Sequence, residues 1–218
     1  MAGLDAGRLN ENAARVREEI AAAANRAGRD PAGVELLVAV KYVDTEDIGA
    51  LADAGLTLLG ENRAQQLEEK VAAWPDHGLR WHFIGQLQSR KVKTILPLVD
   101  LIHSVASDSA LAQLEKHARA GTEILVEVNV AGEEGKAGIA PAELGDFIAR
   151  APVRVAGLMG MPPFAEDPEA SRPHFAALRE LAAAHGLHHL SMGTSQDYRV
   201  AAEEGATIVR VGSLLYAS

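Results

Sequence analysis

The runs Ile124-Leu125-Val126-Glu127-Val128-Asn129 and Ile208-Val209-Arg210-Val211-Gly212 decide the fold of this chain. Along each run one face is apolar throughout, and the other face becomes polar or glycine toward the C-terminal end. An apolar face packs against helices, whereas a face that turns polar at its C-terminal end is typical of a strand lining the mouth of a barrel. An open, flavodoxin-like sheet would place Glu127 and Arg210 under covering helices without evident partners, so a closed barrel is favoured.

Short apolar runs alternate with amphipathic segments along the rest of the chain. The eight strand-like runs are Leu36–Val40, Leu56–Glu61, Trp81–Gly85, Leu101–Val105, Ile124–Asn129, Val153–Gly160, Leu190–Thr194 and Ile208–Gly212. The helical segments between them include Thr45–Ala54, Ala64–Trp74, Asp108–Ala120, Pro141–Arg150 and Glu169–His185. Because parallel strands need crossover helices, these units predict an α/β fold, a (β/α)8 TIM barrel. We expect an extra amphipathic helix over about residues 8–27, a barrel over about 34–216, and a single domain over 1–218.

Composition excludes several classes of function. The chain of 218 residues has 21 Lys and Arg against 30 Asp and Glu, a formal net charge of −9, and no cysteine. An acidic surface repels nucleic acid and anionic membranes, and no apolar run approaches the roughly 18 residues that a membrane span needs. The absence of cysteine removes disulfides and suits a reducing compartment, so we expect a cytoplasmic protein. The histidines at 185, 188 and 189 lack further ligands at a suitable spacing, and we expect no metal.

The candidate functional site consists of Lys41 and two tracts of small residues. Lys41 directly follows the first predicted strand, where it is either the first solvated loop residue or a Schiff-base lysine whose amine is made nucleophilic by an apolar rim. Arg210-Val211-Gly212-Ser213 and Ser191-Met192-Gly193-Thr194-Ser195 end the last two strands. Barrels often bind phosphate with the loops after the seventh and eighth strands, so a phosphate site is predicted there.

Other polar residues near strand ends have simpler interpretations. His82 lies between Trp81 and Phe83, and His103 lies within the fourth strand; both patterns favour hydrogen-bonded core histidines over catalysts. Met159 is predicted by alternation to point into the barrel. No Gly-x-Ser-x-Gly elbow, P-loop or Gly-x-Gly-x-x-Gly occurs.

Taken together, the motifs resemble one family. They are Val38-Ala39-Val40-Lys41, Gly60-Glu61-Asn62, Trp81-His82-Phe83-Ile84-Gly85-Gln86-Leu87-Gln88, Gly157-Leu158-Met159, Ser191-Met192-Gly193 and Val209-Arg210-Val211-Gly212. In this order, from about Leu36 to Gly212, the chain resembles the pyridoxal phosphate homeostasis protein family. The resemblance implies the fold-type III barrel of alanine racemase and a pyridoxal 5′-phosphate (PLP) cofactor held through a lysine imine. It also implies a part in vitamin B6 homeostasis and no established turnover reaction.

The resemblance assigns roles by position. Lys41 matches the imine lysine, and Arg210 matches the arginine that faces the pyridine nitrogen. The phosphate cradle is matched by Ser191, Gly212 and Ser213. The positions that line the ring are Asn62 and Met159. Lys136 matches a family lysine beside the barrel mouth and receives no role. The chain departs from the family at Val40, Thr194 and Tyr216-Ala217, and the last of these departures concerns the packing of the final loop.

Three functions are compared. The first is a protein that carries or buffers PLP, with PLP-dependent apoenzymes as recipients; it is not expected to be an enzyme. A cationic Arg210 disfavours protonation of the ring nitrogen and so weakens the ring as an electron sink. The second is a small PLP-dependent amino-acid racemase, whose further acid/base group would be Lys136, Tyr198 or His82. The third is a phosphosugar-binding barrel enzyme, which gives no reason for Lys41 with Arg210. A monomer is expected, because no long apolar surface stripe remains.

Overall fold

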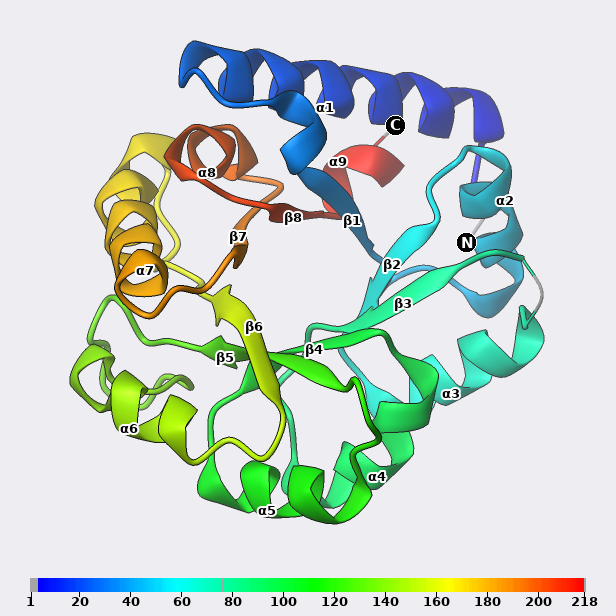
Figure 1. The fold of residues 1–218 in the computed structure, drawn as a ribbon. Helices are drawn as coiled ribbons and strands as arrows, with labels where there is room; N and C mark the ends of the chain where they lie inside the picture. Colours follow the sequence, from blue (N-terminus) through cyan, green and yellow to red (C-terminus); the bar gives the residue numbers. More distant parts are fainter. Residues whose placement is uncertain (1–3, 76, 218) are drawn as a thin grey trace.

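Eight parallel strands form a closed barrel in the computed structural model, which describes residues 4–75 and 77–217 (Figure 1). Each strand pairs with its neighbours in chain order, and β8 closes the barrel against β1 with Leu37 opposite Arg210. The strands are β1 Glu35–Ala39, β2 Leu58–Glu61, β3 Arg80–Phe83, β4 Leu101–Val105, β5 Glu123–Glu127, β6 Arg154–Met159, β7 His189–Thr194 and β8 Ile208–Val211. The predicted (β/α)8 TIM barrel is confirmed.

Helices surround the barrel between successive strands. The α-helices are α1 Ala6–Arg26, α2 Ile48–Asp53, α3 Ala64–Ala73, α4 Val92–Ile95, α5 Asp108–His117, α6 Leu144–Ala149, α7 Arg172–Ala184, α8 Tyr198–Glu204 and α9 Ser213–Tyr216. Short 3₁₀ turns precede several of them, so the predicted helices Thr45–Ala54, Pro141–Arg150 and Glu169–His185 each split into a 3₁₀ turn and a shorter α-helix. The short helices α4, α8 and α9 lie outside the helical segments named from the sequence.

Side-chain alternation produces two separate apolar clusters. The smaller cluster fills the barrel interior and consists of Leu37, Leu58, Leu101, Leu125, Ala156, Met159 and Ile208. The larger cluster lies between strands and helices and includes Ile124, Val126, Val128, Val209 and Val211. The predicted division of the fifth and eighth strands into an outer apolar face and an inner face is therefore confirmed, and so is the inward position of Met159.

The N-terminal helix α1 covers the outside of the barrel next to its closure. It begins after Asp5, whose carboxylate accepts the N–H of Arg8 at 2.8 Å, and it packs against α8 and α9 (Figure 1). The buried Asn12 amide donates to the carbonyls of Leu215 and Ala217 at 3.2 Å each. The expected extra helix thus exists, begins two residues earlier than predicted, and fixes the segment that follows β8.

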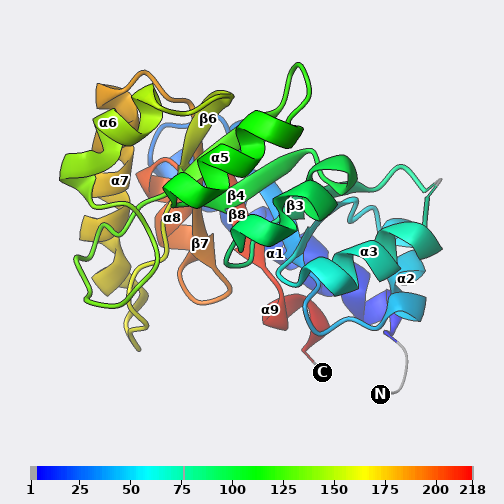
Figure 2. The same ribbon diagram turned by 90° about the horizontal axis from the view of Figure 1, so that it is seen from below.

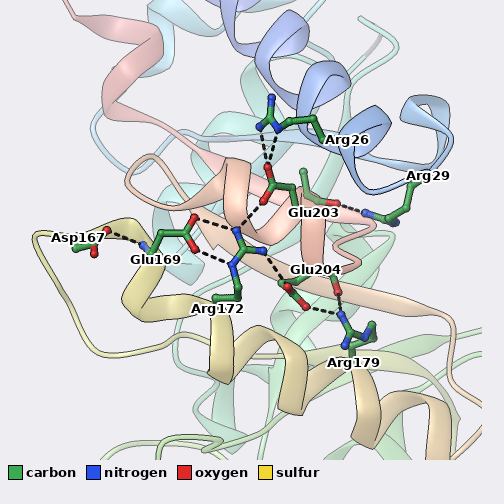
Figure 3. A network of polar contacts seen from close by, with 9 residues as sticks. Arg26, Arg29, Asp167, Glu169, Arg172, Arg179, Glu203 and Glu204 are labelled. Carbon is green, nitrogen blue, oxygen red and sulfur yellow. Dashed lines mark hydrogen bonds and ion pairs between the residues drawn. The ribbon is translucent and has the colours of Figure 1, made fainter.

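An ion-pair network joins α1, α7 and α8 (Figure 3). Arg172, at the start of α7, contacts Glu169 at 2.6 Å, Glu203 at 2.7 Å and Glu204 at 2.9 Å. Arg26 of α1 binds the other side of Glu203 at 2.7 Å. Because Arg172 contacts three carboxylates and Glu203 contacts two arginines, the network stabilises the fold more than isolated surface ion pairs would. The network anchors α8, the helix that directly follows β7.

The loop after β7 and the short helix α9 lie on the same side of the molecule (Figure 2). They follow the C-terminal ends of β7 and β8, so this side is the barrel mouth. In the described ranges, no helix combines the length and the hydropathy that crossing a bilayer requires.

Candidate functional site at the barrel mouth

Lys41 occupies a fixed turn directly after β1. The N–H of Val40 extends the ladder to the carbonyl of Gly60 at 2.9 Å, and Val43 closes the turn by donating to the carbonyl of Val40 at 3.0 Å. The Lys41 side chain is exposed, and its ammonium lies 4.7 Å from the centre of the Tyr42 ring. The backbone at Lys41 is thus held in place while its amine remains accessible.

A buried ion pair holds this turn from the outside of the barrel. Lys70 of α3 donates to Glu61 at 2.6 Å and to the carbonyl of Val40 at 2.7 Å. The side chains of Lys70 and Glu61 are 3% and 0% exposed. The second carboxylate oxygen of Glu61 accepts the N–H groups of Asn62 and Arg63 at 2.6 and 3.0 Å. One pair of charges therefore fixes the segments that carry Lys41 and Asn62.

Sequence reasoning did not select Lys70, although a signal exists. Leu58 lies in the inner cluster and Leu59 in the outer one, so alternation turns Glu61 outward, beneath a helix. A carboxylate in that position needs a cationic partner. The α3 residue that supplies this partner is evident only after the helix is placed.

Arg210 lies inside the barrel and is 8% exposed. It donates to the carbonyl of Ser191 at 2.8 Å, to the hydroxyl of Ser191, and to the carbonyl of Gly160 at 3.2 Å. Burial lowers its pKa to about 10, opposed by the attraction of Asp197 and Glu127. It therefore remains a cation at neutral pH. Burial likewise raises the pKa of Glu127, and Arg210 opposes that shift.

Ser191 lies beneath Arg210 rather than at the surface of the mouth. Its side chain is fully buried, and its hydroxyl contacts both Arg210 and, at 2.8 Å, Nδ1 of His103. Nε2 of His103 lies 2.9 Å from Nδ1 of His82. These contacts favour a role for Ser191 in holding Arg210; the expectation that its hydroxyl meets a phosphate stays a prediction. His82 and His103 are hydrogen-bonded core histidines, as predicted.

The lowered pKa values of both histidines favour the neutral imidazole at pH 7. Burial is the main cause that lowers the pKa of His82, to about 4, and it lowers the pKa of His103 well below the usual range. For His103, the nearby His82 and Arg210 act in the same direction.

The loops after β7 and β8 meet at Gly212. Its N–H donates to the hydroxyl of Ser195 at 3.1 Å, and a Cβ at this position would lie 3.0 Å from the carbonyl oxygen of Ala39. Asp197 shapes the β7 loop by accepting the N–H of Thr194 at 2.7 Å and the hydroxyl of Ser171 at 2.8 Å. Ser213 begins α9 and is exposed. Gly212 and Ser213 therefore lie beside the β7 loop, where the phosphate site is predicted.

The remaining predicted residues occupy different positions. Asn62 follows β2 at the mouth, and its buried Oδ1 has no hydrogen-bond partner among the described residues. Met159 is buried in the barrel interior. Lys136 is exposed on the loop after β5 and pairs with Glu133. Tyr198 lies outside the barrel, where its hydroxyl donates to Glu19 of α1. Among the described residues, no cluster of His, Asp and Glu could hold a metal ion.

The fold and the site define a barrel of the alanine racemase N-terminal domain type, and the chain matches that family over residues 8–218. A pyridoxal phosphate homeostasis protein of Aquifex aeolicus is 44% identical, covering 94% of this chain and 96% of that protein. One of Pseudomonas aeruginosa is 38% identical, covering 95% and 94%. This chain belongs to the family of pyridoxal phosphate homeostasis proteins.

Solved structures agree with this assignment. The structure of PipY of Synechococcus elongatus with PLP bound has a TM-score of 0.80 and 30% identity, and it covers 96% of this chain and all of that one (100%). An alanine racemase of Corynebacterium glutamicum has a TM-score of 0.76 at 13% identity. This chain covers 62% of the racemase, and at that identity the likeness concerns the fold alone.

Loss of Lys70 should destabilise the protein strongly. In Lys70→Met the carboxylate of Glu61 stays buried without its cation, a situation that typically costs about 3–5 kcal/mol. Arg80→Met is the matched control: it removes an exposed pair with Glu35, at 51% and 41% side-chain exposure, and should cost less than about 1 kcal/mol. Urea unfolding measures both. Equal losses in the two variants would contradict the special position of Lys70.

The neutral His82 should make the protein less stable in acid. Between pH 6.5 and pH 4 the unfolded chain is protonated at His82 while the folded chain is not. The contribution of His82 to the free energy of unfolding is therefore fully present above pH 6.5 and is lost as the pH falls to about 4. At about 1.4 kcal/mol per pKa unit, His82 accounts for about 3 kcal/mol of this loss. His82→Gln should reduce the pH dependence of the free energy of unfolding by that amount, and the exposed control His188→Gln should not. Parallel pH profiles for wild type and His82→Gln would refute the assignment.

Proposed function

We propose that this chain binds PLP at the barrel mouth and carries or buffers the cofactor in vitamin B6 homeostasis. When bound, PLP supplies an aldehyde that a lysine amine captures reversibly. The observation that carries the proposal is the accessible Lys41 on a turn held by the buried Lys70, at the same mouth as Arg210 and the Gly212 loop. PipY, with PLP bound, supports the choice of ligand.

The residues of the mouth fit the three ends of PLP. The amine of Lys41 suits the aldehyde. Gly212 suits the phosphate, because its backbone N–H lies where the β7 and β8 loops meet, and its close approach to the Ala39 carbonyl requires a residue without a side chain. Arg210 suits the pyridine nitrogen, since a guanidinium can only donate hydrogen bonds and so favours an unprotonated nitrogen. The Oδ1 of Asn62, which has no hydrogen-bond partner in the described part of the chain, and the thioether of Met159 would line the ring.

Carrying the cofactor is proposed in preference to racemase turnover. A second acid/base group would have to reach the ring from its far face. Tyr198 is directed toward Glu19 outside the barrel, His82 is buried within it, and Lys136 pairs with Glu133. We further propose PLP-dependent apoenzymes as recipients, a monomeric state and a cytoplasmic location, the last supported by an acidic, cysteine-free composition.

Lys41 should be the residue that takes up PLP. Borohydride reduction after incubation with PLP should place the pyridoxyl group on Lys41, identified by peptide mapping, because this amine is accessible at the mouth. Lys41→Ala should lose the label, whereas the control Lys136→Ala should retain it. Labelling mainly at Lys136 in the wild type would refute the assignment.

The site should prefer PLP to pyridoxal. Charge-assisted hydrogen bonds are worth about 1.5–3 kcal/mol each, so two or three from the Gly212–Ser213 region should favour the phosphate ester by roughly ten- to a hundredfold after desolvation costs. Ser213→Ala should lower this preference and leave labelling of Lys41 intact. Ser109→Ala, at an exposed position of α5, is the control. Competition between the two aldehydes, followed by borohydride labelling, measures the ratio; equal affinities in the wild type would exclude a phosphate cradle.

A further inference from the structure

Among the described residues, the buried charge of Arg210 has no direct carboxylate partner. Within the described residues, its hydrogen bonds go to the carbonyls of Ser191 and Gly160 and to the Ser191 hydroxyl. The carboxylates of Asp197 and Glu127 attract it only from a distance. A buried cation held in this way depends on the orientation of neighbouring dipoles.

The contacts below Arg210 define a directed chain of hydrogen bonds. A guanidinium has no acceptor, so the Ser191 oxygen accepts from it, and the single hydroxyl proton of Ser191 is then free to point to Nδ1 of His103. A neutral His103 that accepts at Nδ1 carries its proton on Nε2 and donates to Nδ1 of His82. The proton of His82 is then on Nε2. In this direction each dipole presents its negative end to Arg210, and each of the three hydrogen bonds in the chain has one donor and one acceptor.

The opposite direction is less favourable. If His103 donated from Nδ1 to Ser191, the hydroxyl proton would lose its acceptor on His103, and the imidazole dipole would present its positive end to the cation. The charged or titratable groups facing the two histidines are Glu35, Arg80, His189 and Arg210. Of these, Arg210 is the one that is hydrogen-bonded to the chain, through Ser191, so it sets the direction.

Packing alone does not explain two imidazoles in this position. Much of the barrel interior is an apolar cluster that includes Leu37, Leu101 and Leu125, and aliphatic side chains at 82 and 103 would continue it. Polar groups enter such a core at a desolvation cost, which the hydrogen-bonded chain offsets. The chain crosses the barrel from β3 through β4 and β7 to β8, and its end is the guanidinium at the proposed ligand site.

We propose that His103 and His82 are positioning residues for Arg210. Acting through Ser191, the two neutral imidazoles hold the guanidinium in one place and orient it toward the ring nitrogen of bound PLP, which thereby stays unprotonated. This inference rests on the proposed function. It adds two residues, far from Lys41 in the chain, that control the electronic state of the ligand rather than its attachment.

The decisive experiment follows the ring nitrogen itself. With ¹⁵N-labelled PLP bound, the nitrogen chemical shift is recorded against pH in wild type, His103→Leu and Ser191→Ala. In both variants the hydrogen-bonded chain that orients Arg210 is broken, although its contacts with the carbonyls of Ser191 and Gly160 remain. The midpoint for protonation of the ring nitrogen should therefore rise by at least about one pH unit, a tenfold change in the equilibrium. Lys41 should still take the borohydride label. His188→Leu, at an exposed position, should titrate as the wild type does.

Two controls separate the possible failures. Ser191→Ala carries the test if His103→Leu does not fold, since it removes one hydroxyl and keeps the backbone carbonyl that Arg210 contacts. Independently of PLP, histidine ¹⁵N spectra of the wild type should show both imidazoles protonated on Nε2; protonation on Nδ1 of either one would overturn the chain. If the variants still take the label at Lys41 but their ring nitrogen titrates as in the wild type, this inference alone is overturned. A wild type that takes no label at Lys41 overturns the proposed function and this inference with it.

Discussion

Closure of eight parallel strands is the constraint on which the site depends. In a closed barrel every second side chain points inward, so the inward side chains of one strand lie at successive levels along the barrel axis. On β8 this places Ile208 in the apolar interior, Arg210 above it, and Gly212 at the mouth. Lys41 and Asn62 follow β1 and β2 and reach the same edge because all strands run in one direction. The mouth is therefore assembled from segments that are far apart in the chain.

Two buried cations illustrate how the inside and the outside of the barrel differ. Lys70 lies between α3 and the barrel wall and meets a carboxylate directly, because the outward-facing Glu61 is within reach. Arg210 lies inside, where it donates to two carbonyls and to the Ser191 hydroxyl, and the two histidines follow Ser191 in the hydrogen-bonded chain. The ion pair makes Lys70 a fixed structural element. Among the described residues no carboxylate is bound to Arg210, so its positive charge fits the role proposed for it toward a ligand.

Contacts outside the proposed ligand site fix the loops at the mouth. Asp197 organises the turn after β7, and the Arg172 network fixes the helix α8 that follows this turn. Lys70 does the same for the turn that carries Lys41. Such anchoring allows an accessible amine and a bare glycine loop to keep their relative positions without a covering domain in the described part of the chain.

The sequence by itself determined the barrel, the inward faces of β5 and β8, and the placement of Lys41, Arg210 and Gly212 at strand ends, because alternation and strand direction are local properties. It also identified His82 and His103 as core residues. It left open which groups contact one another. Examples are the ion pair of Lys70 with Glu61 and the contact of Ser191 with Arg210, where the sequence had suggested a loop at the mouth for Ser191. Those pairings depend on the stagger between strands and on the rotation of each helix against the wall. Both are set by the packing of the whole barrel, so only the tertiary structure decided them.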